Sequence, residues 1–195
     1  MNTVLTPAAV SALIRSRKSV FPAMYDGNQP IDKAIIEEML ENANWAPTHK
    51  KTEPWRFRVI RGEALKELAQ AMGEAYTRIT PSEKFSEQAH KKFTTNPTKP
   101  NTIIAIILKR DAEESLPLWE EEAALAMAVQ NMWLTATAYG LGSFWSSPGV
   151  TKHIGEFLQL EEGESCYGLF YLSHYHSPEV VRERGAIADK VKWME

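Results

Sequence analysis

A cluster of basic and hydroxyl side chains lies where the first predicted helix ends. Within residues 11–21, Arg15, Arg17 and Lys18 stand beside Ser16 and Ser19. Guanidinium, ammonium and hydroxyl groups are the donors that bind phosphate and other oxyanions. The same cations also complement the negative end of the helix macrodipole, so the cluster taken alone is explained without a ligand. It becomes a candidate anion site only if other segments join it.

Common catalytic motifs are absent from the sequence. It contains no G-x-G-x-x-G, P-loop, G-x-S-x-G, H-E-x-x-H or paired C-x-x-C pattern. His174 and His176 lie on one face of a predicted strand, but no cysteine or carboxylate pattern completes a site around them, so we expect no metal. The single cysteine, Cys166, lies in the apolar stretch CYGLFYL and is expected to be a buried hydrophobic side chain.

Length and composition predict one globular domain that covers residues 1–195. The 44% hydrophobic and 24% charged residues are close to globular averages. A net charge of -3 argues against a nucleic-acid partner, because nucleic-acid binders normally carry a basic surplus. The N-terminus lacks a basic region followed by an apolar run, and the apolar segment 123–139 is interrupted by Gln130 and Asn131. We therefore expect no export, no membrane insertion and a cytoplasmic location.

The elements that must position the candidate residues begin with two capped helices. Thr6 followed by Pro7 predicts the start of the first helix, and Asp32 predicts the N-cap of the second. Apolar and basic residues alternate over residues 55–59 as in a half-buried strand, whereas TIIAIIL, residues 102–108, is typical of a fully buried strand.

The second half of the chain predicts a long central helix over residues 118–139, buried around most of its circumference. GLGSFWSSPG then predicts a short strand and a turn, and Thr151 is expected to cap a helix that ends at Leu158. Residues 165–175 predict one more buried strand. This order predicts an α+β domain, an α/β sandwich in which helices cover a small mixed or antiparallel sheet.

Four stretches together resemble the nitroreductase family of FMN-dependent oxidoreductases. RKS, residues 17–19, is similar to the family's Arg-Arg-Ser element, and APTHKKTEPW, residues 46–55, is similar to its Ala-Pro-Ser…Asn-x-Gln-Pro-Trp segment. AVQNMWLTATAYGLGSFW, residues 128–145, resembles the long helix that ends in Gly-Leu-Gly, and RGAIADKVKW, residues 184–193, resembles the tail. The stretches follow the family's order over nearly the whole chain. The resemblance implies a nitroreductase-like fold.

The resemblance implies that the basic cluster contacts FMN. Arg17 and Ser19 would supply a planar fork and a hydroxyl for the phosphate or the pyrimidine carbonyls, and Lys18 would add a mobile positive charge. Arg184 would be a second phosphate contact, with an exposed charge as the alternative. Arg15 falls outside the matched element and is interpreted as a helix-end charge.

Two further parts of the flavin site are implied by the resemblance. Trp145, Ser146 and Ser147 correspond to the loop that packs against the isoalloxazine face. His49 would reach the flavin of a partner subunit, and Trp45 would form a wall of the pocket. The alternatives are a loop histidine for His49 and a core anchor at a helix end for Trp45, and the core role is the simpler interpretation of the tryptophan.

The chain departs from the family at two positions. Lys51 stands where the family commonly has asparagine, and Glu53 stands where it commonly has glutamine. A lysine can replace an amide as a donor and is a candidate flavin contact, whereas an ionised glutamate only accepts hydrogen bonds.

The implied function is that of an FMN enzyme. It would take hydride from NADH or NADPH and pass it to an electron-poor small-molecule acceptor, a nitro compound or a quinone, with no side-chain acid or base required. The resemblance implies a homodimer with FMN at the subunit interface. The alternative is a non-catalytic protein that binds or sequesters flavin, which Lys51 and Glu53 motivate.

Overall fold

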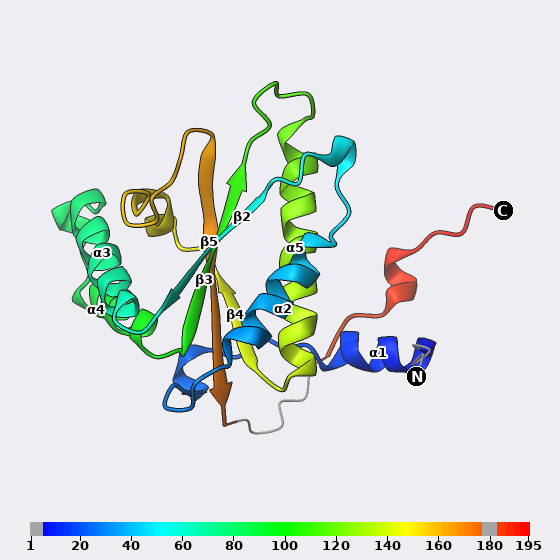
Figure 1. The fold of residues 1–195 in the computed structure, drawn as a ribbon, viewed down its shortest axis with the longest axis horizontal. Coiled ribbons are helices and arrows are strands. Elements are labelled where there is room, and N and C mark those ends of the chain that lie inside the picture. The colour runs from blue at the N-terminus through cyan, green and yellow to red at the C-terminus, as the bar shows by residue number, and fades with distance from the viewer. Residues whose placement is uncertain (1–5, 177–182) are drawn as a thin grey trace.

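The computed structural model describes residues 6–176 and 183–195 (Figure 1). The helices are α1 (Pro7–Ser16), α2 (Lys33–Asn44), α3 (Ala64–Ile79), α4 (Glu87–Thr95) and α5 (Leu118–Ala138). The strands are β1 (Tyr25–Asp26), β2 (Trp55–Arg61), β3 (Thr102–Lys109), β4 (Gly142–Ser146) and β5 (Glu164–Tyr175).

The strands form a five-stranded sheet in which all pairings between named strands are antiparallel. β5 is the central strand: β3 pairs with it on one side, and β4 and β1 pair with successive parts of it on the other. β2 pairs with β3 and forms one edge of the sheet. A single parallel bridge joins Ser19 to Ser143, which places the segment after α1 beside β4. The predicted α+β sandwich is confirmed.

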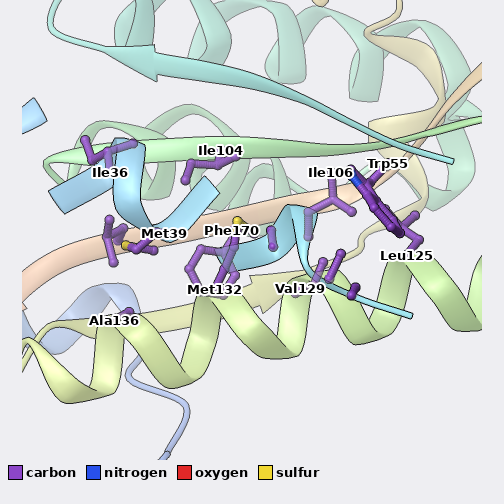
Figure 2. Packing of buried hydrophobic residues seen from close by; sticks show 14 of the residues in the cluster. Ile36, Met39, Trp55, Ile104, Ile106, Leu125, Val129, Met132, Ala136 and Phe170 are labelled. Carbon is purple, nitrogen blue, oxygen red and sulfur yellow. The ribbon is translucent and has the colours of Figure 1, made fainter. Parts of the chain in front are cut away.

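Helices α2 and α5 cover one face of the sheet. Leu125, Val129 and Met132 of α5 point toward Ile104, Ile106 and Phe170 of β3 and β5 (Figure 2). Every residue of β3 except its last is buried, because the strand has a helical layer on each face. The predicted buried strand is confirmed, and so is the extent of the long helix. The expectation that α5 is buried around most of its circumference is wrong for a single copy of the chain, because the helix packs on the sheet with one face and leaves apolar side chains such as Trp119 and Met127 exposed on the other.

Helices α3 and α4 lie on the opposite face. Leu65, Leu68 and Met72 of α3 pack on the alternate residues of β3 and on β5, and Val150, Ile154 and Leu158 complete this second core. The period-two alternation of a strand thus divides β3 between two hydrophobic cores. Trp55 is buried in the first core, as expected.

The first helix and the described part of the tail extend beyond this sandwich. Figure 1 shows α1 and residues 183–195 reaching out past α5, on the side away from α3 and α4. No residue of α1 is buried, and all residues from 183 to 195 are exposed. The first part of the charged tail, residues 177–182, lies outside the described residues.

Most predicted element boundaries are confirmed. The Thr6 and Asp32 side chains accept hydrogen bonds from the backbone N–H groups of Ala9 and Ala34, as N-caps do. The helix predicted from Thr151 to Leu158 is wrong: a 3₁₀ helix, Gly149–His153, is followed by turns. The Thr151 hydroxyl donates to the carbonyl of Pro148, so it does not accept from a following N–H.

Candidate functional site

The basic cluster is held in place by aromatic side chains. The Arg17 guanidinium carbon lies 4.5 Å from the centre of the Trp133 ring, and the Trp133 indole donates to the Lys18 carbonyl over 3.2 Å. The Lys18 ammonium lies over the ring of Tyr175 at 5.1 Å. Cation–π contacts of this kind hold a cation against the face of an aromatic ring and so restrict its orientation. Residues 17 and 18 are half-buried, whereas Arg15 is exposed.

Arg17 and Arg184 line the same cavity, although 167 positions separate them in the sequence. This cavity, which we call the basic cavity, has a volume of about 410 Å³ and is also lined by Ile14 and Arg15. The structure therefore brings together the two predicted phosphate contacts. It also adds Arg15, which the sequence pattern had assigned only to the end of the helix.

β4 leads from the basic cluster to a larger cavity. Ser143 is the bridge partner of Ser19, and its carbonyl accepts the N–H of Val20 over 2.9 Å. From Ser143 to Ser147 an extended chain advances about 13 Å at 3.3 Å per residue. The predicted residues Trp145, Ser146 and Ser147 therefore lie at the far end of β4 from the basic cluster.

The cavity at this end, which we call the β4 cavity, has a volume of about 670 Å³. Its lining consists of Glu122, Trp145, Ser147, Pro148, Thr151, Lys152, Leu160, Glu164, Ser165, Cys166 and Tyr167. It combines an indole face with several donors and acceptors, which is the composition expected of a small-molecule site. The buried position predicted for Cys166 is confirmed, and burial raises the pKa of its thiol.

Most residues of the β4 cavity were not predicted as site residues from the sequence, and Tyr167 and Glu122 are two of them. The Tyr167 hydroxyl donates to Oε1 of Glu122 over 2.7 Å, and the Trp145 indole donates to the Tyr167 carbonyl over 3.1 Å. Burial, followed by the hydrogen bond to Glu122, raises the pKa of Tyr167 to about 12. Its hydroxyl therefore stays protonated throughout the physiological range.

A β-bulge directs Tyr167 into this site. Ile106 pairs with Gly168 and Ile107 pairs with Cys166, so Tyr167 is the extra residue without a partner on β3. Since successive side chains of a strand alternate between faces, one inserted residue reverses the faces beyond it. A glycine inside an apolar strand pattern is the sequence signal for such a bulge.

A buried ion pair supports the end of α5 that carries Glu122. The guanidinium of Arg110 binds the Glu121 carboxylate, and a second Arg110 nitrogen donates to the Leu116 carbonyl over 2.7 Å. The other Glu121 oxygen accepts the N–H of Asp111 over 3.0 Å. Because Glu121 is paired and fully hydrogen-bonded at both oxygens, its burial is compensated, and the first turn of α5 is tied to the end of β3.

His49 and Lys51, in the segment after α2, line neither the basic cavity nor the β4 cavity. His49 Nδ1 lies 2.6 Å from Glu120 Oε2 of α5, and the Lys50 ammonium donates to the Ser115 carbonyl over 3.0 Å. Lys50, Lys51 and Glu53 all have positive φ, between 42° and 57°, an unfavourable conformation for side chains with a Cβ. This region lines a cavity of about 370 Å³ together with Trp119, separate from the two cavities described above.

Trp45 is not a core anchor, and that interpretation is wrong. Its side chain is 78% exposed, and its indole donates to Glu41 one helical turn earlier over 3.0 Å. The residue ends α2 as its C-cap, and at that position the ring points away from the sheet-facing side of the helix. Within one copy of the chain, neither Trp45 nor His49 lines the basic cavity or the β4 cavity.

The fold is that of an α+β sandwich, an open antiparallel sheet between two helical layers. Its candidate ligand sites are a basic helix end and a cavity at the two ends of one edge strand. The sequence model described as the Nitroreductase family matches residues 14–174, and the chain belongs to that family. The recognition made from the four sequence stretches is confirmed.

Individual relatives agree with this assignment. YfhC of Bacillus subtilis is 25% identical to this chain over 91% of this chain and 90% of its own length. YdjA of Escherichia coli K12 is 27% identical over 70% of this chain and 74% of its own length. Both carry the name "Putative NAD(P)H nitroreductase". The crystal structure of a nitroreductase-like family protein from Bacillus cereus superposes with a TM-score of 0.80 at 24% identity, covering 100% of this chain and 99% of that one. The crystal structure of a nitroreductase with bound FMN from Bacteroides fragilis superposes with a TM-score of 0.72 at 21% identity. The superposition covers 95% of this chain and 98% of that one.

Residues 6–176 and 183–195 contain neither a membrane-spanning helix nor a cluster of metal ligands. None of their helices has the length and apolar character needed to cross a membrane. Within the same residues, no group of three or more histidine, cysteine or carboxylate side chains is arranged to hold a metal ion.

Proposed function

We propose that this protein is an FMN-dependent oxidoreductase that takes hydride from NADH or NADPH and passes it to an electron-poor small molecule, a nitro compound or a quinone. The observation that carries the proposal is the basic cavity, where Arg17 and Arg184 meet from opposite ends of the chain. Family membership and the printed names of the relatives support the same reaction class.

The residues present fit FMN. Its phosphate needs several cationic donors, and the basic cavity supplies guanidinium groups, one of them oriented by Trp133. Its ring system needs an apolar surface with polar groups at the edge, and the β4 cavity supplies the Trp145 indole beside the Ser147 hydroxyl. β4 runs between the two sites: Ser143 is the bridge partner of Ser19 beside the basic cluster, and Trp145 lines the β4 cavity.

The chemistry divides between cofactor and protein. When bound, FMN supplies the hydride transfer, which is chemistry that no side chain of this protein provides. Arg17 and Arg184 bind the phosphate, and Ser19 offers a hydroxyl beside β4. Trp145 orients the ring system and excludes water from one side of it.

We further propose that the functional unit is a homodimer. Trp119 and Met127 on the outer face of α5 are 65% and 40% exposed, and Trp193 in the tail is 83% exposed. Large apolar side chains gathered on one side of a molecule are typical of a protein interface. His49 lines a cavity together with Trp119 and Met127, so it would reach the flavin of a second copy rather than that of its own chain. Lys51, two residues further along the chain, would do the same.

The experiment is anaerobic reduction of the purified protein. We expect yellow protein whose flavin absorbance is lost on addition of NADH or NADPH and returns on addition of menadione. A coloured protein that neither nicotinamide bleaches would instead support a flavin-sequestering role. A colourless protein that does not bind added FMN would refute the cofactor assignment.

Arg17→Ala with Arg15→Ala as its control tests the basic cavity. We expect Arg17→Ala to weaken FMN binding about 100-fold, because a charge-assisted, pre-oriented donor is lost. Arg15→Ala should weaken it less: Arg15 also lines the cavity, but it lies outside the family element, and Trp133 orients Arg17. The affinities follow from fluorescence titration of cofactor-free protein with FMN. Equal losses in the two variants would show that phosphate binding does not depend on Arg17 in particular.

A further inference from the structure

The Tyr167–Glu122 pair has no role in the function proposed above. Both side chains line the β4 cavity, and they come from different layers of the fold, Tyr167 from the sheet and Glu122 from α5. Their hydrogen bond of 2.7 Å is formed at the wall of a cavity large enough for a small aromatic molecule.

The backbone is adapted to present this hydroxyl. Leu169 and Tyr171 of β5 face α3. Since every second side chain of a regular strand lies on the same face, residue 167 would face α3 as well if β5 were regular. The bulge reverses that direction. Tyr167 therefore packs against the core on the α5 side of the sheet, and Cys166 packs in the core on the α3 side. Bulges next to active sites re-aim side chains in this way.

Reduction of the proposed acceptors requires a proton donor. A quinone becomes a hydroquinone by gaining one hydride and one proton, and a nitro group becomes a nitroso group and water by gaining the same pair. The hydride carries both electrons and one hydrogen. The second hydrogen must reach an acceptor oxygen as a proton, and negative charge builds up on that oxygen until it arrives.

Tyr167 has the properties that this step demands. Its hydroxyl is protonated at neutral pH, and because its pKa is raised it gives up the proton only to an oxygen that has gained negative charge, as the acceptor oxygen does after hydride transfer. The charged groups around it are Glu121 and Glu122 of α5 and Arg110, and Arg110 is bound to Glu121. Glu164, a further acid of the cavity, is bound to Arg58 at 3.0 Å. Glu121 and Glu164 are thus each paired with an arginine, and Glu122 is the carboxylate that is hydrogen-bonded to the Tyr167 hydroxyl.

We propose that Tyr167 is a catalytic residue that donates its hydroxyl proton to an oxygen of a quinone or nitro acceptor bound in the β4 cavity. The Tyr167 O–H bond breaks as the O–H bond on the acceptor forms, and the tyrosine oxygen takes back a proton that reaches it from solvent water through Glu122. The hydride comes from the reaction under "Proposed function", on which this inference rests.

The test separates the two half-reactions of the FMN-loaded enzyme. For Tyr167→Phe we expect anaerobic bleaching by the nicotinamide within twofold of wild type, and reoxidation by menadione slowed about 100-fold, the lower range for loss of a general acid. The matched control is Tyr139→Phe. Tyr139 also donates to a glutamate, Glu38, but it lies at the opposite end of α5. We expect both of its half-reactions to equal those of wild type.

Two further measurements distinguish catalysis from structure. The solvent deuterium isotope effect on reoxidation should be the same in wild type and in Tyr139→Phe and larger in Tyr167→Phe, where the proton has to come directly from water and its delivery limits the rate. Calorimetric titration of the oxidised protein with 4-nitrobenzyl alcohol should show about fivefold weaker binding to Tyr167→Phe, as expected for one missing hydrogen bond. Unchanged reoxidation, or equal slowing of both half-reactions, would overturn the inference. If wild-type protein is not bleached at all, it is the proposed function that fails.

Discussion

Gly168 is the residue on which the geometry of the β4 cavity depends. Its φ of +138° is a conformation that residues with a side chain rarely adopt. A Cβ at this position would lie 2.5 Å from Nε1 of Trp145 and 2.6 Å from the carbonyl oxygen of Ser146. The glycine therefore permits both the bulge beside Tyr167 and the close approach of the indole that lines the cavity.

Gly168→Ala is expected to lower the free energy of unfolding by about 3 kcal/mol, from backbone strain combined with overpacking. Gly149→Ala is the control, because a Cβ there meets no atom within 4 Å, and its cost should stay below about 0.5 kcal/mol. Urea unfolding followed by circular dichroism measures both. Similar stabilities for the two variants would mean that β5 accommodates a side chain at the bulge.

At the scale of elements, α5 joins every part of the proposed site. Its inner face packs on the sheet, and Arg110 fixes its first turn. Glu122 of this helix lines the β4 cavity. Trp133 contacts Arg17 of the basic cluster. Its outer face carries Trp119 and Met127, with His49 held against it by Glu120. Large apolar side chains on the outer face of a helix favour a partner on that face, which is the basis of the homodimer proposed above.

Met127→Glu is expected to convert the proposed dimer into a monomer, because a carboxylate would have to be buried in an apolar interface. Val59→Glu is the control, since Val59 is similarly exposed, 43% against 40%, but lies on the edge strand β2. Light scattering after size-exclusion chromatography gives the mass of each variant. A wild-type monomer, or a Met127→Glu dimer, would contradict the assignment of α5 as the interface.

At the scale of the molecule, the sequence was sufficient for the parts of the fold with strong local signals. The caps at Thr6 and Asp32, the buried strand around Ile104 and the extent of α5 follow from cap chemistry and hydrophobic periodicity. The tyrosine of the β4 cavity could not be predicted, because alternation fails at a bulge and its face is set by pairing with a distant strand. The exposure of Trp45 was missed for a similar reason, since no local pattern tells which side of a helix end has a neighbour.

A pH-dependent stability also belongs to the whole fold. Burial raises the pKa values of Tyr25 and Tyr171 in the core between the sheet and α3, and the buried Tyr25 hydroxyl has no hydrogen-bond partner among residues 6–176 and 183–195. Above pH about 10, the ordinary tyrosine pKa, the unfolded chain loses protons that the folded one keeps. The free energy of unfolding therefore falls as the pH rises from there toward the raised folded values.

Tyr25→Phe is expected to be as stable as wild type or about 1 kcal/mol more stable at neutral pH, because it removes an unsatisfied hydroxyl. Its loss of stability between pH about 9 and about 11 should be shallower than that of wild type, since one titrating group is missing. Urea unfolding across this range measures both effects. Parallel curves for the two proteins would show that Tyr25 does not titrate on unfolding.

The outer strand β2 has a consequence for how the protein behaves when it is concentrated. A free sheet edge is a template for pairing with another chain, and charged residues along it oppose such pairing. Arg56, Arg58 and Arg61 lie along this edge, and Arg56 and Arg61 donate to the carbonyls of Glu53 and Ile31 at 2.9 and 2.6 Å. A second molecule adding as a strand would bring its own arginines against these fixed charges. β2 thus protects the protein from fibre-like aggregation and leaves the helical side for specific association.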